Sequence, residues 1–455
     1  MTRPGGGSAG SRVFEALLLA RPAARFLLGG SSRGDVVARA LRLRERLLRE
    51  GAVDEPVCLA SEDRLTVAAA LLASLAGGPP VVIPHDGTRE ALRAACEAVP
   101  FGRAVGDDPS VLPAGVRLVP LPARGARGPF RLLRALDEPF LHLHTGGSTG
   151  HPRSWTKTPR NLLAEARFHA GRYGLGAPDG IVATVSPRHI YGLLFSIVVP
   201  LVSGAAVLRE SPFFPAAIGR ALAHRRATVL VTVPAHVHAL ARTAWHARLR
   251  LALSSTGPLE EADAARFAAR AEIAVEELYG STETGGVAVR CRAGGRDAWQ
   301  ALAGVRWTIV HGRLRVASPY LSPELPRDGR GFFATADRAA RAGTRFALLG
   351  RADGIAKVGG RRVDVGEIEE RIRSLPGVRD AWVWSRAGRG ARGDEIVALV
   401  TGTAEPRAIR SMLRGSLPPA AWPRRVRRVA RLPRTAAGKR DRMAAEMLLD
   451  RGGTR

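Results

Sequence analysis

Cysteine is scarce in this sequence, and long apolar runs are absent. The three cysteines, Cys58, Cys96 and Cys291, are odd in number and widely spaced, so neither a disulfide framework nor a zinc site is indicated. Unpaired thiols of this kind are typical of a reducing compartment, and we expect a cytoplasmic protein. The longest apolar stretch, residues 193–208, is interrupted by serine, proline and glycine. It is shorter than the roughly 20 residues of a membrane-spanning helix, so we expect no membrane span.

Lysine is the scarcest charged residue. Only Lys157, Lys357 and Lys439 occur, against 66 arginines that are spread along the whole chain and raise the formal net charge to +28. Such a charge would ordinarily suggest nucleic acid or an anionic membrane as a partner. The even spread and the aromatic content of only 5% disfavour a nucleic-acid footprint. We therefore expect no nucleic-acid partner and keep nucleic-acid binding as the weaker alternative.

The retained lysines carry information of their own. Where arginine serves at almost every basic position, a lysine indicates a place that needs a compact ammonium rather than a planar guanidinium. Chance retention is the alternative, and for Lys157 the sequence leaves both interpretations open.

The chain is long enough for more than one domain. Single cores stop growing near roughly 250–300 residues, so a chain of 455 residues fits two or three domains. Near the N-terminus, helical periodicity alternates with short apolar runs, as in βαβ units around a parallel sheet. Helices are expected at 35–50, 66–76 and 89–98, and strands at 57–60 and 80–84. Residues 102–129 are rich in glycine, proline and arginine and are expected to loop over the surface.

Strand signals return in the middle of the chain. They occur at 181–185, 207–208, 229–233 and 251–255. This order predicts Ser186, Pro234, Ser255 and Tyr279 at the carboxyl ends of strands, where open α/β sheets bind ligands. A β hairpin is expected within residues 305–319.

These patterns predict an α/β fold with two domains. The large N-terminal domain, residues 1–350, is expected to consist of stacked mixed or parallel sheets, with a small β-rich subdomain at about 300–350. A compact α+β domain follows at 351–455, because the composition changes again after residue 350.

A loop of small and hydroxylated residues follows the apolar strand near residue 141. Its members are Thr145, Gly146, Gly147, Ser148, Thr149 and Gly150. The glycines allow several backbone N–H groups to face one anion, and the hydroxyls can donate to phosphate oxygens. The loop lacks the Gly-Lys-Ser/Thr ending of a Walker loop. Taken alone, a plain turn is the better interpretation.

Four later segments change that interpretation, because they follow the loop in one order. They read LYGSTE at 278–283, TAD at 335–337, GRADGIAKVGGR at 350–361 and PRTAAGK at 433–439. Together with the loop they resemble the adenylate-forming superfamily of acyl- and aryl-CoA synthetases, nonribosomal peptide synthetase adenylation domains and luciferases. The resemblance covers the chain from the loop to the C-terminus.

The resemblance implies a two-step ligase reaction. ATP and Mg²⁺ would activate a small carboxylic acid to an acyl-adenylate with release of pyrophosphate. The acyl group would then pass to the thiol of CoA, or to the phosphopantetheine thiol of an acidic acyl carrier protein, to give a thioester. The loop and the motif at 148–158 also resemble ligases of aryl polyene and polyketide-type pigment pathways, which favours an aryl or short acyl acid.

Roles for single residues follow from the same resemblance. Lys439 would bridge the substrate carboxylate and the α-phosphate. Thr282 would contact the α-phosphate, Glu283 would bind the magnesium ion, and Tyr279 would stack near the adenine. Without the family, the YGSTE segment is equally acceptable as a strand exit with a helix cap.

Further residues are expected around the nucleotide and the hinge of the C-terminal domain. Asp337 would accept hydrogen bonds from both ribose hydroxyls, as a carboxylate can, and Arg351 would add a ribose or phosphate contact. Asp353 would be the hinge of a mobile lid, and Gly359 and Gly360 would line the path of the thiol. A simple hairpin turn is the alternative for the two glycines.

The acid is expected to bind elsewhere on the large domain. By resemblance, His189 lies near the substrate, and Ser255, Thr256 and Gly257 form a wall of its pocket. A lone histidine is more often structural than catalytic, so only proximity is expected of His189.

Several positions depart from the family pattern. The loop closes with Arg153 where the family commonly has lysine; Lys157 could replace it, and a solvated surface lysine is the alternative. Ala336 and Arg313 also replace usual residues. These departures motivate the rival interpretation, a scaffold of the same fold that binds an acid without turnover.

Overall fold

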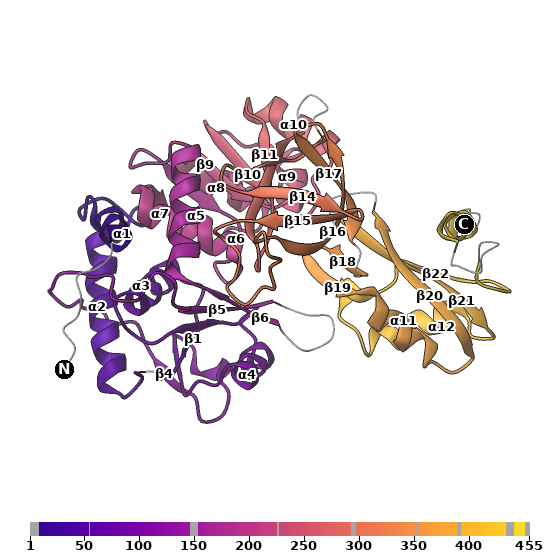
Figure 1. Ribbon diagram of the computed structural model, residues 1–455, viewed down its shortest axis with the longest axis horizontal. Helices are drawn as coiled ribbons and strands as arrows, with labels where there is room; N and C mark the ends of the chain where they lie inside the picture. Colours follow the sequence, from indigo (N-terminus) through magenta and orange to yellow (C-terminus); the bar gives the residue numbers. More distant parts are fainter. Residues whose placement is uncertain are drawn as a thin grey trace. The chain divides into compact units, whose positions relative to one another are not determined.

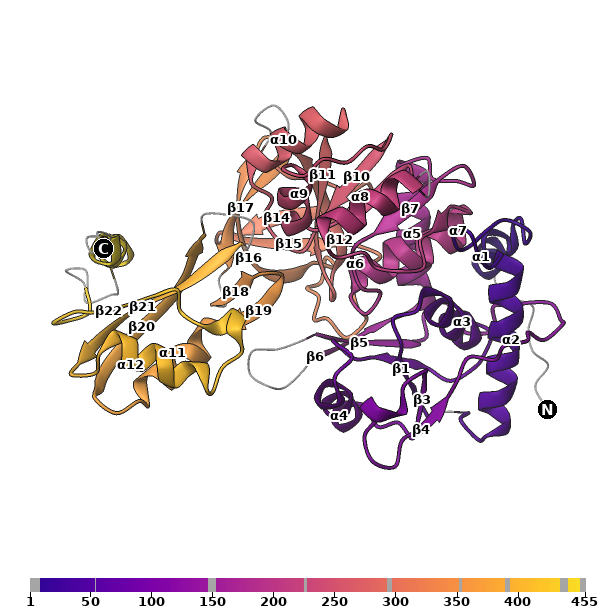
Figure 2. The same ribbon diagram turned by 180° about the vertical axis from the view of Figure 1, so that it is seen from behind.

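The computed structural model describes residues 9–53, 55–145, 153–224, 227–292, 297–351, 354–388, 393–433 and 441–450. These residues form two compact units, drawn from opposite sides in Figures 1 and 2. The large unit holds the described residues as far as Leu348, except Ala336–Arg338. The small unit holds those three residues and the described chain from Leu349 onward. Each unit has an apolar core of its own.

The first sheet of the large unit has six strands in the order β4-β3-β1-β2-β5-β6. Their bounds are Val57–Ala60 (β1), Val81–Ile83 (β2), Arg103–Gly106 (β3), Arg117–Val119 (β4), Leu141–Thr145 (β5) and Arg153–Lys157 (β6). The strands from β4 to β5 run parallel, and β6 is antiparallel to β5. The accompanying helices are α1 (Ala9–Leu19), α2 (Arg33–Arg49), α3 (Arg64–Leu75) and α4 (Arg89–Ala98). The expected βαβ pattern is confirmed.

The expectation of a surface loop at residues 102–129 is wrong. This segment supplies β3 and β4, which pair with β1 and with each other at one side of the sheet. Ala104, Val105 and Val119 are buried there. Strands of three and four residues are too short to show a period of two, and the glycine, proline and arginine around them obscured the signal.

The second sheet of the large unit has seven strands in the order β13-β12-β11-β10-β9-β7-β8. Their bounds are Gly180–Ala183 (β7), Ala206–Val207 (β8), Val229–Thr232 (β9), Leu251–Ser254 (β10), Val275–Ser281 (β11), Gly285–Cys291 (β12) and Gln300–Ala301 (β13). The five strands from β8 to β11 in this order run parallel, and β12 and β13 are antiparallel. Its helices are α5 (Pro159–Arg172), α8 (Pro215–His224), α9 (Pro234–Leu240) and α10 (Glu261–Ala271). The mixed α/β fold class is therefore confirmed.

The two sheets share one apolar core. Leu59 and Ile83 of the first sheet and Val231 and Leu253 of the second belong to the same buried cluster. The apolar stretch 190–203 also joins it, as α6 (Ile190–Leu193), a π-helix (Leu194–Val198) and α7 (Val199–Ser203). The long apolar run is thus an internal packing element, as expected, and no helix within the described ranges is both long and apolar enough to cross a membrane.

A four-stranded sheet in the order β14-β15-β16-β17 follows. Its strands are Arg306–Val310 (β14), Arg313–Ala317 (β15), Phe333–Ala342 (β16) and Arg345–Arg351 (β17). The predicted hairpin is present: β14 and β15 are antiparallel and are joined at His311 and Gly312, both of which have positive φ.

The small unit is α+β. It contains β18 (Ile355–Val358), β19 (Arg361–Asp364), α11 (Val365–Arg373), β20 (Val378–Ala387), β21 (Asp394–Gly402), α12 (Pro406–Arg414), β22 (Arg425–Arg428) and α13 (Arg442–Asp450). Side chains alternate between the two faces of β20, as the period of two requires. Ala381 and Val383 pack with α11 and α12, whereas Trp382 and Trp384 pack with α13. Both faces of the β20-β21-β22 sheet are therefore covered.

Candidate active site

The carboxyl ends of four parallel strands meet at one edge of the seven-stranded sheet. The strands β7, β9, β10 and β11 run side by side in the same direction, so the segments that follow them emerge together. These segments begin at Thr184, Val233, Ser255 and Thr282. The structure thus brings together, on one edge, most of the residues that the sequence singled out in the large unit.

The turn after β11 is rich in hydroxyls and held by its own hydrogen bonds. The backbone N–H of Ser281 donates to Oγ1 of Thr284 (3.0 Å), the N–H of Thr284 donates to Oγ of Ser281 (3.3 Å), and the two hydroxyl oxygens lie 2.9 Å apart. The N–H of Ser322 donates to the carbonyl of Glu283 (2.8 Å). These bonds fix the backbone of Thr282 and Glu283, whose side chains are partly exposed.

Gly280 permits this turn. The pairing of β11 with β12 shifts register between Tyr279 and Gly280. A Cβ built on Gly280 would lie 2.3 Å from the carbonyl oxygen of Gly285, closer than any side chain can approach. Glycine is therefore required for the two strands to close just before Glu283.

Backbone strain marks the neighbouring segment. Thr256 has φ of 78°, a region that non-glycine residues rarely adopt. The hydroxyl of Ser255 donates to the carbonyl of Leu278 (2.9 Å) and ties this segment to β11. Strain of this kind is often stored at functional sites. Ser255, Thr256 and Gly257 are all partly exposed beside the end of β11.

Tyr279 lies near the end of β11 within an aromatic group. Its ring centroid is 5.5 Å from that of Trp299 and 6.2 Å from that of Phe346. The guanidinium of Arg290 also contacts this group and lies 4.3 Å from the ring centroid of Trp299. Tyr279 is half-buried, so part of its side chain remains available for an aromatic ligand.

A second polar group lies at the ends of β7 and β9. Nδ1 of His236 is 2.8 Å from Oγ1 of Thr184, which is 2.8 Å from Oγ1 of Thr232. Burial lowers the pKa of His236, which favours the neutral form of its imidazole. The exposed ring of Phe213 meets it edge-on, 5.2 Å away. Thr184 and Phe213 carry no sequence signal of their own and were not predicted.

His189 lies on the same edge. It is the residue before α6 and its side chain is exposed, without a capping hydrogen bond to the helix. Its neighbour Arg188 is buried and donates to the carboxylate of Glu62 (2.9 Å). The ion pair fixes the segment that carries His189.

The predicted phosphate loop joins two paired strands. Thr145 at the end of β5 lies opposite Arg153 at the start of β6, and the hydroxyl of Thr145 donates to the carbonyl of Arg153 (3.3 Å). The side chain of Arg153 is exposed. The other loop residues, Gly146, Gly147, Ser148, Thr149 and Gly150, lie outside the described residues.

The alternative of a solvated Lys157 is wrong. Only 1% of this residue is exposed, at the end of β6. Its ammonium donates to the carbonyls of Tyr320 (2.9 Å) and Glu283 (3.4 Å). Side chains alternate between the two faces of a strand, and at this position of β6 the side chain points inward. The many arginines of the chain, which are typical of a protein surface, did not suggest that this lysine is buried.

Other predicted residues belong to β16, β17 and the small unit. Asp337 is half-buried on β16, and Arg351 ends β17, where its side chain lies outside the described residues. Gly359 and Gly360 form the two-residue turn between β18 and β19, with φ of 57° and 80°. This is the predicted hairpin alternative, and positive φ at both positions favours glycine. Asp353 and Lys439 lie outside the described residues.

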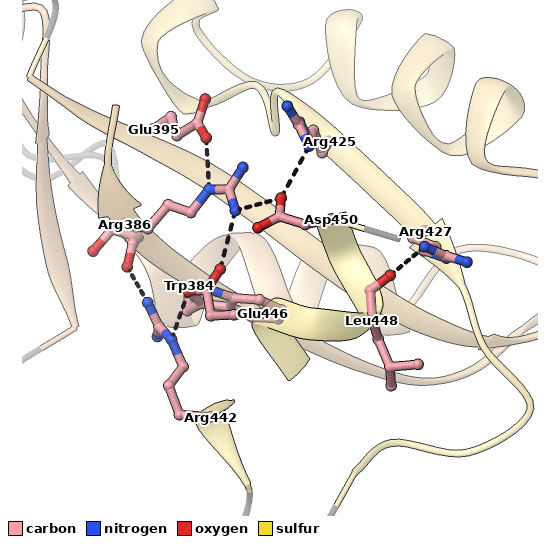
Figure 3. Close-up of polar contacts among 10 residues, drawn as sticks. Trp384, Arg386, Glu395, Arg425, Arg427, Arg442, Glu446, Leu448 and Asp450 are labelled. Atoms are coloured by element: carbon pink, nitrogen blue, oxygen red, sulfur yellow. Dashed lines mark hydrogen bonds and ion pairs between the residues drawn. The ribbon is translucent and has the colours of Figure 1, made fainter. Parts of the chain in front are cut away.

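The ends of the segment that contains Lys439 are held within the small unit. The N–H of Asp441 donates to the carbonyl of Pro433 (3.1 Å). Figure 3 shows how α13 is then fixed to the sheet: Glu446 accepts from Trp384 and Arg386, and Asp450 accepts from Arg386 and Arg425. The positions of Pro433 and Asp441, the described residues on either side of this segment, are therefore fixed within the small unit.

The turn after β11 offers ligands for a divalent cation whose remaining ligands would come from phosphate groups. Within the described residues there is no group of three His, Cys, Asp or Glu side chains that could hold a metal alone. Glu283 offers one carboxylate beside the hydroxyl of Thr282. Mg²⁺ typically binds one or two carboxylates and completes its shell with phosphate oxygens and water. The donor set matches that pattern.

Two family models match the chain. The model described as "AMP-binding enzyme" matches residues 21–331, and the one described as "AMP-binding enzyme C-terminal domain" matches residues 367–439.

Individual proteins match over much of the chain. A sulfoacetate–CoA ligase of Cupriavidus necator is 30% identical over 343 residues, which are 68% of this chain and 66% of that protein. A 4-coumarate–CoA ligase of Rhodobacter capsulatus is 30% identical over 319 residues, 68% of this chain and 77% of that protein. The amide bond synthetase McbA from Marinactinospora thermotolerans superposes with a TM-score of 0.77 at 20% identity, over 96% of this chain and 99% of its own.

Proposed function

Because the chain belongs to the AMP-binding enzyme family, and its relatives that are acid–CoA ligases make it an AMP-forming acid–thiol ligase, we propose that it activates an aryl or short acyl acid. The carboxylate attacks the α-phosphate of ATP, and pyrophosphate leaves. The thiol of CoA or of a carrier protein then attacks the acyl carbon of the adenylate, AMP leaves, and a thioester results.

The observation that carries this proposal is the turn after β11. Hydrogen bonds between Ser281 and Thr284 fix it, and it carries Thr282 and Glu283 at the strand ends where Ser255–Gly257 also lies. Such pre-ordered donors and acceptors at a strand edge favour positioning of a triphosphate for in-line displacement. A bound Mg²⁺ would neutralise phosphate charge, and Glu283 is the residue proposed to hold it.

We propose matching roles for the other residues. Thr145 and Arg153 begin and end the phosphate loop, and Arg153 keeps the positive charge that lysine commonly supplies there. Asp337 binds the ribose, with Arg351 beside it. Tyr279 offers the adenine an aromatic surface that Trp299 and Phe346 support.

The C-terminal part, residues 351–455, is proposed to be a lid that turns about Asp353. It would bring Lys439 to the acid in the first half-reaction and Gly359 and Gly360 to the thiol path in the second. The glycine turn between β18 and β19 has no side chains, which suits passage of a thin pantetheine arm.

The acid is proposed to lie against the segments that follow β7, β9 and β10. The relatives act on 4-coumarate, an aryl acid, and on sulfoacetate, a short acid with a second anionic group. The aromatic ring of Phe213 and the neutral imidazole of His236 favour the aryl class. The net charge of +28 suits an acidic carrier protein as the acceptor, and three free thiols suit the cytoplasm.

Acid-dependent exchange of pyrophosphate into ATP tests the first half-reaction. Aryl acids, sulfoacetate, malonate and simple short acids are compared, and the aryl acids are expected to give the fastest exchange. AMP release is then measured with CoA and with a holo carrier protein. If no acid supports exchange, the protein is an acid-binding scaffold and the proposal fails.

Lys439→Ala tests the lid. Loss of the ammonium leaves the developing charge on the α-phosphate uncompensated, so exchange is expected to fall by about 10³-fold or more. The thermal unfolding curve serves as the control, because the fold should be unaffected. Near-normal exchange would remove the assignment.

A further inference from the structure

Two buried charges lie behind the turn that carries Glu283. Lys157 on β6 is 1% exposed and Glu165 on α5 is 3% exposed. Burial lowers the pKa of Lys157 and raises that of Glu165, while the charge of each opposes the shift of the other. Buried charges are costly unless they are paired and hydrogen-bonded, so both must have defined partners.

The two charges bind the same turn from opposite ends. Lys157 donates to the carbonyl of Glu283 (3.4 Å), and Oε1 of Glu165 accepts from the backbone N–H of Gly286 (2.6 Å). Between these points lie only Thr284 and Gly285. The backbone that carries the Glu283 carboxylate is thus held on one side by an ammonium and on the other by a carboxylate.

A second segment is bound into the same arrangement. Lys157 also donates to the carbonyl of Tyr320 (2.9 Å), and Nδ2 of Asn161 donates to the carbonyl of Pro319 (2.7 Å). The N–H of Ser322 in turn donates to the carbonyl of Glu283 (2.8 Å). Hydrogen bonds from the end of β6 and the start of α5 therefore connect the Glu283 turn to residues 319–322.

The packing around Glu165 leaves no room for adjustment. A Cβ on Gly285 would lie 2.7 Å from Oε2 of Glu165 and 2.6 Å from the Cβ of Tyr320. A Cβ on Gly286 would lie 2.9 Å from Oε1 of the same carboxylate. Two glycines in sequence thus allow the buried carboxylate to reach the main chain of the turn.

The site also explains the use of lysine in an arginine-rich chain. The main-chain acceptors around the Lys157 ammonium are two carbonyls, and an ammonium with three donors can satisfy them in a small volume. A guanidinium has five donors in a rigid fork, so several would be left buried without acceptors. Need for a compact cation, rather than chance, accounts for this lysine.

We propose that Lys157 and Glu165 are positioning residues that hold the Glu283 carboxylate in the orientation that the divalent cation of the bound nucleotide requires. The inference rests on the proposed function for what Glu283 binds. Lys157 and Glu165 should therefore affect how activity depends on the Mg²⁺ concentration, and should not affect recognition of the acid.

Three variants and one control test it. Lys157→Met removes the ammonium, Glu165→Gln removes the carboxylate charge, and the double variant removes both charges so that neither remains unpaired. Arg33→Met is the matched control, because Arg33 is 2% exposed and donates to main-chain carbonyls of Leu17 and Leu18, away from the turn. Unfolding curves identify which variants fold.

The first readout is pyrophosphate exchange as a function of Mg²⁺ concentration. The half-saturating Mg²⁺ concentration is expected to rise about 10-fold or more in the single and double variants, as when groups behind a metal ligand are removed. The KM of the acid is expected to change less than about twofold, because the substitutions do not alter the contacts that bind the acid. Arg33→Met should keep the wild-type Mg²⁺ dependence even if its stability falls.

The second readout needs no turnover. Calorimetry measures binding of a non-hydrolysable ATP analogue at increasing Mg²⁺, in the wild type, in the variants and in Glu283→Gln. If the wild type supports no exchange with any acid, the proposed function fails, but a shifted Mg²⁺ dependence of analogue binding in the Lys157 and Glu165 variants still supports the pair.

Two results overturn the inference. One is a folded double variant with the wild-type Mg²⁺ dependence in both readouts, which would make the pair purely structural. The other is analogue binding that depends on Mg²⁺ in the wild type and is unchanged by Glu283→Gln, which would show that the turn does not serve the cation.

Discussion

The buried pair in the large unit and the arginine network in the small unit use charge in opposite ways. Lys157 and Glu165 are almost inaccessible to water, and each binds one or two main-chain groups, in the Glu283 turn and, for Lys157, also at Tyr320. Arg386 instead reaches three carboxylates, those of Glu395 (2.6 Å), Glu446 (3.1 Å) and Asp450 (3.1 Å), two of which are on α13 (Figure 3). The first arrangement fixes a few atoms, and the second attaches a whole helix through contacts that can replace one another.

This difference predicts how each region tolerates loss of a charge. In a buried pair the remaining partner is left without compensation, so a single change is severe and a double change is mild. In a partly exposed network with several partners, water and neighbouring charges compensate for the lost charge, so any single change is small. Four measurements can sharpen or break the comparison, from the largest expected effect to the smallest.

The largest effect is expected for Lys157→Met. Loss of the ammonium leaves the carbonyls of Tyr320 and Glu283 without a buried donor and removes the positive charge that favours the ionised form of Glu165, so the free energy of unfolding of the large unit should fall by about 3–5 kcal/mol. Denaturant unfolding, with hydrogen exchange to assign the transition to the large unit, measures it. The double variant with Glu165→Gln should recover the part of the loss that comes from the Glu165 charge, and equal losses in the single and double variants would contradict the comparison.

Acid should weaken the large unit through buried imidazoles. Burial lowers the pKa of His169 to about 3, with a smaller effect from Arg172, and that of His144 to about 4. In the unfolded chain each titrates near 6.5, so between that pH and the folded pKa only the unfolded state binds the proton. The stability that each neutral histidine contributes is therefore complete above about pH 6.5 and declines as the pH falls, by about 2 kcal/mol per histidine at pH 5.

His169→Gln isolates one of these contributions. The variant should lose about 2 kcal/mol less than the wild type between pH 8 and pH 5, whatever its stability at pH 8. The carboxylate of Glu165 lies 3.9 Å from Nε2 of His169, and identical pH profiles would show that this contact offsets burial. Residues 349–455 contain no histidine, so their exchange protection serves as the internal control.

A smaller effect is expected for Arg386→Met in the small unit. Its carboxylate partners Glu446 and Asp450 keep contacts with Arg442 and Arg425, so the loss of stability should be about 1 kcal/mol. Hydrogen exchange of α13 measures it. The loss should shrink further at 1 M salt, where the Debye length is about 3 Å. A cost as large as that of Lys157→Met would show that the two regions do not differ.

The smallest effect is expected for Arg93→Ala on α4. Its ion pair with Glu97 (2.6 Å) joins side chains that are 63% and 62% exposed. Pairs four residues apart on a helix surface contribute about 0.5 kcal/mol or less. A larger change in thermal unfolding would mean that exposed arginines of this chain are not interchangeable.

Much of the fold was accessible from the sequence because its signals were local. The hairpin at His311 and Gly312, the helix expected at residues 35–50 and the strand series that ends at Ser254 all appear where periodicity and turn residues indicated. The strands β3 and β4 were missed because the pairing of β3 with β1 and of β4 with β3, not a local pattern, makes them strands.

Only those residues of the site that belong to a sequence motif could be predicted. The order of motifs pointed to Glu283, yet nothing local pointed to Glu165, which falls within the helical periodicity of α5 like any other position. The rarity of lysine marked Lys157 but not the side of β6 on which it lies. Burial depends on which strand pairs with which, and that information is spread over the whole chain.

The covered face of the β20-β21-β22 sheet gives the protein an intrinsic optical reporter. The indole rings of Trp382 and Trp384 lie 5.0 Å apart, the Nε1–H of Trp384 donates to Glu446, and the guanidinium of Arg442 lies 5.0 Å from its ring. Detachment of α13 would bring water to both rings and shift their fluorescence emission to longer wavelength. Release of α13 from the sheet can thus be followed in real time without any attached dye.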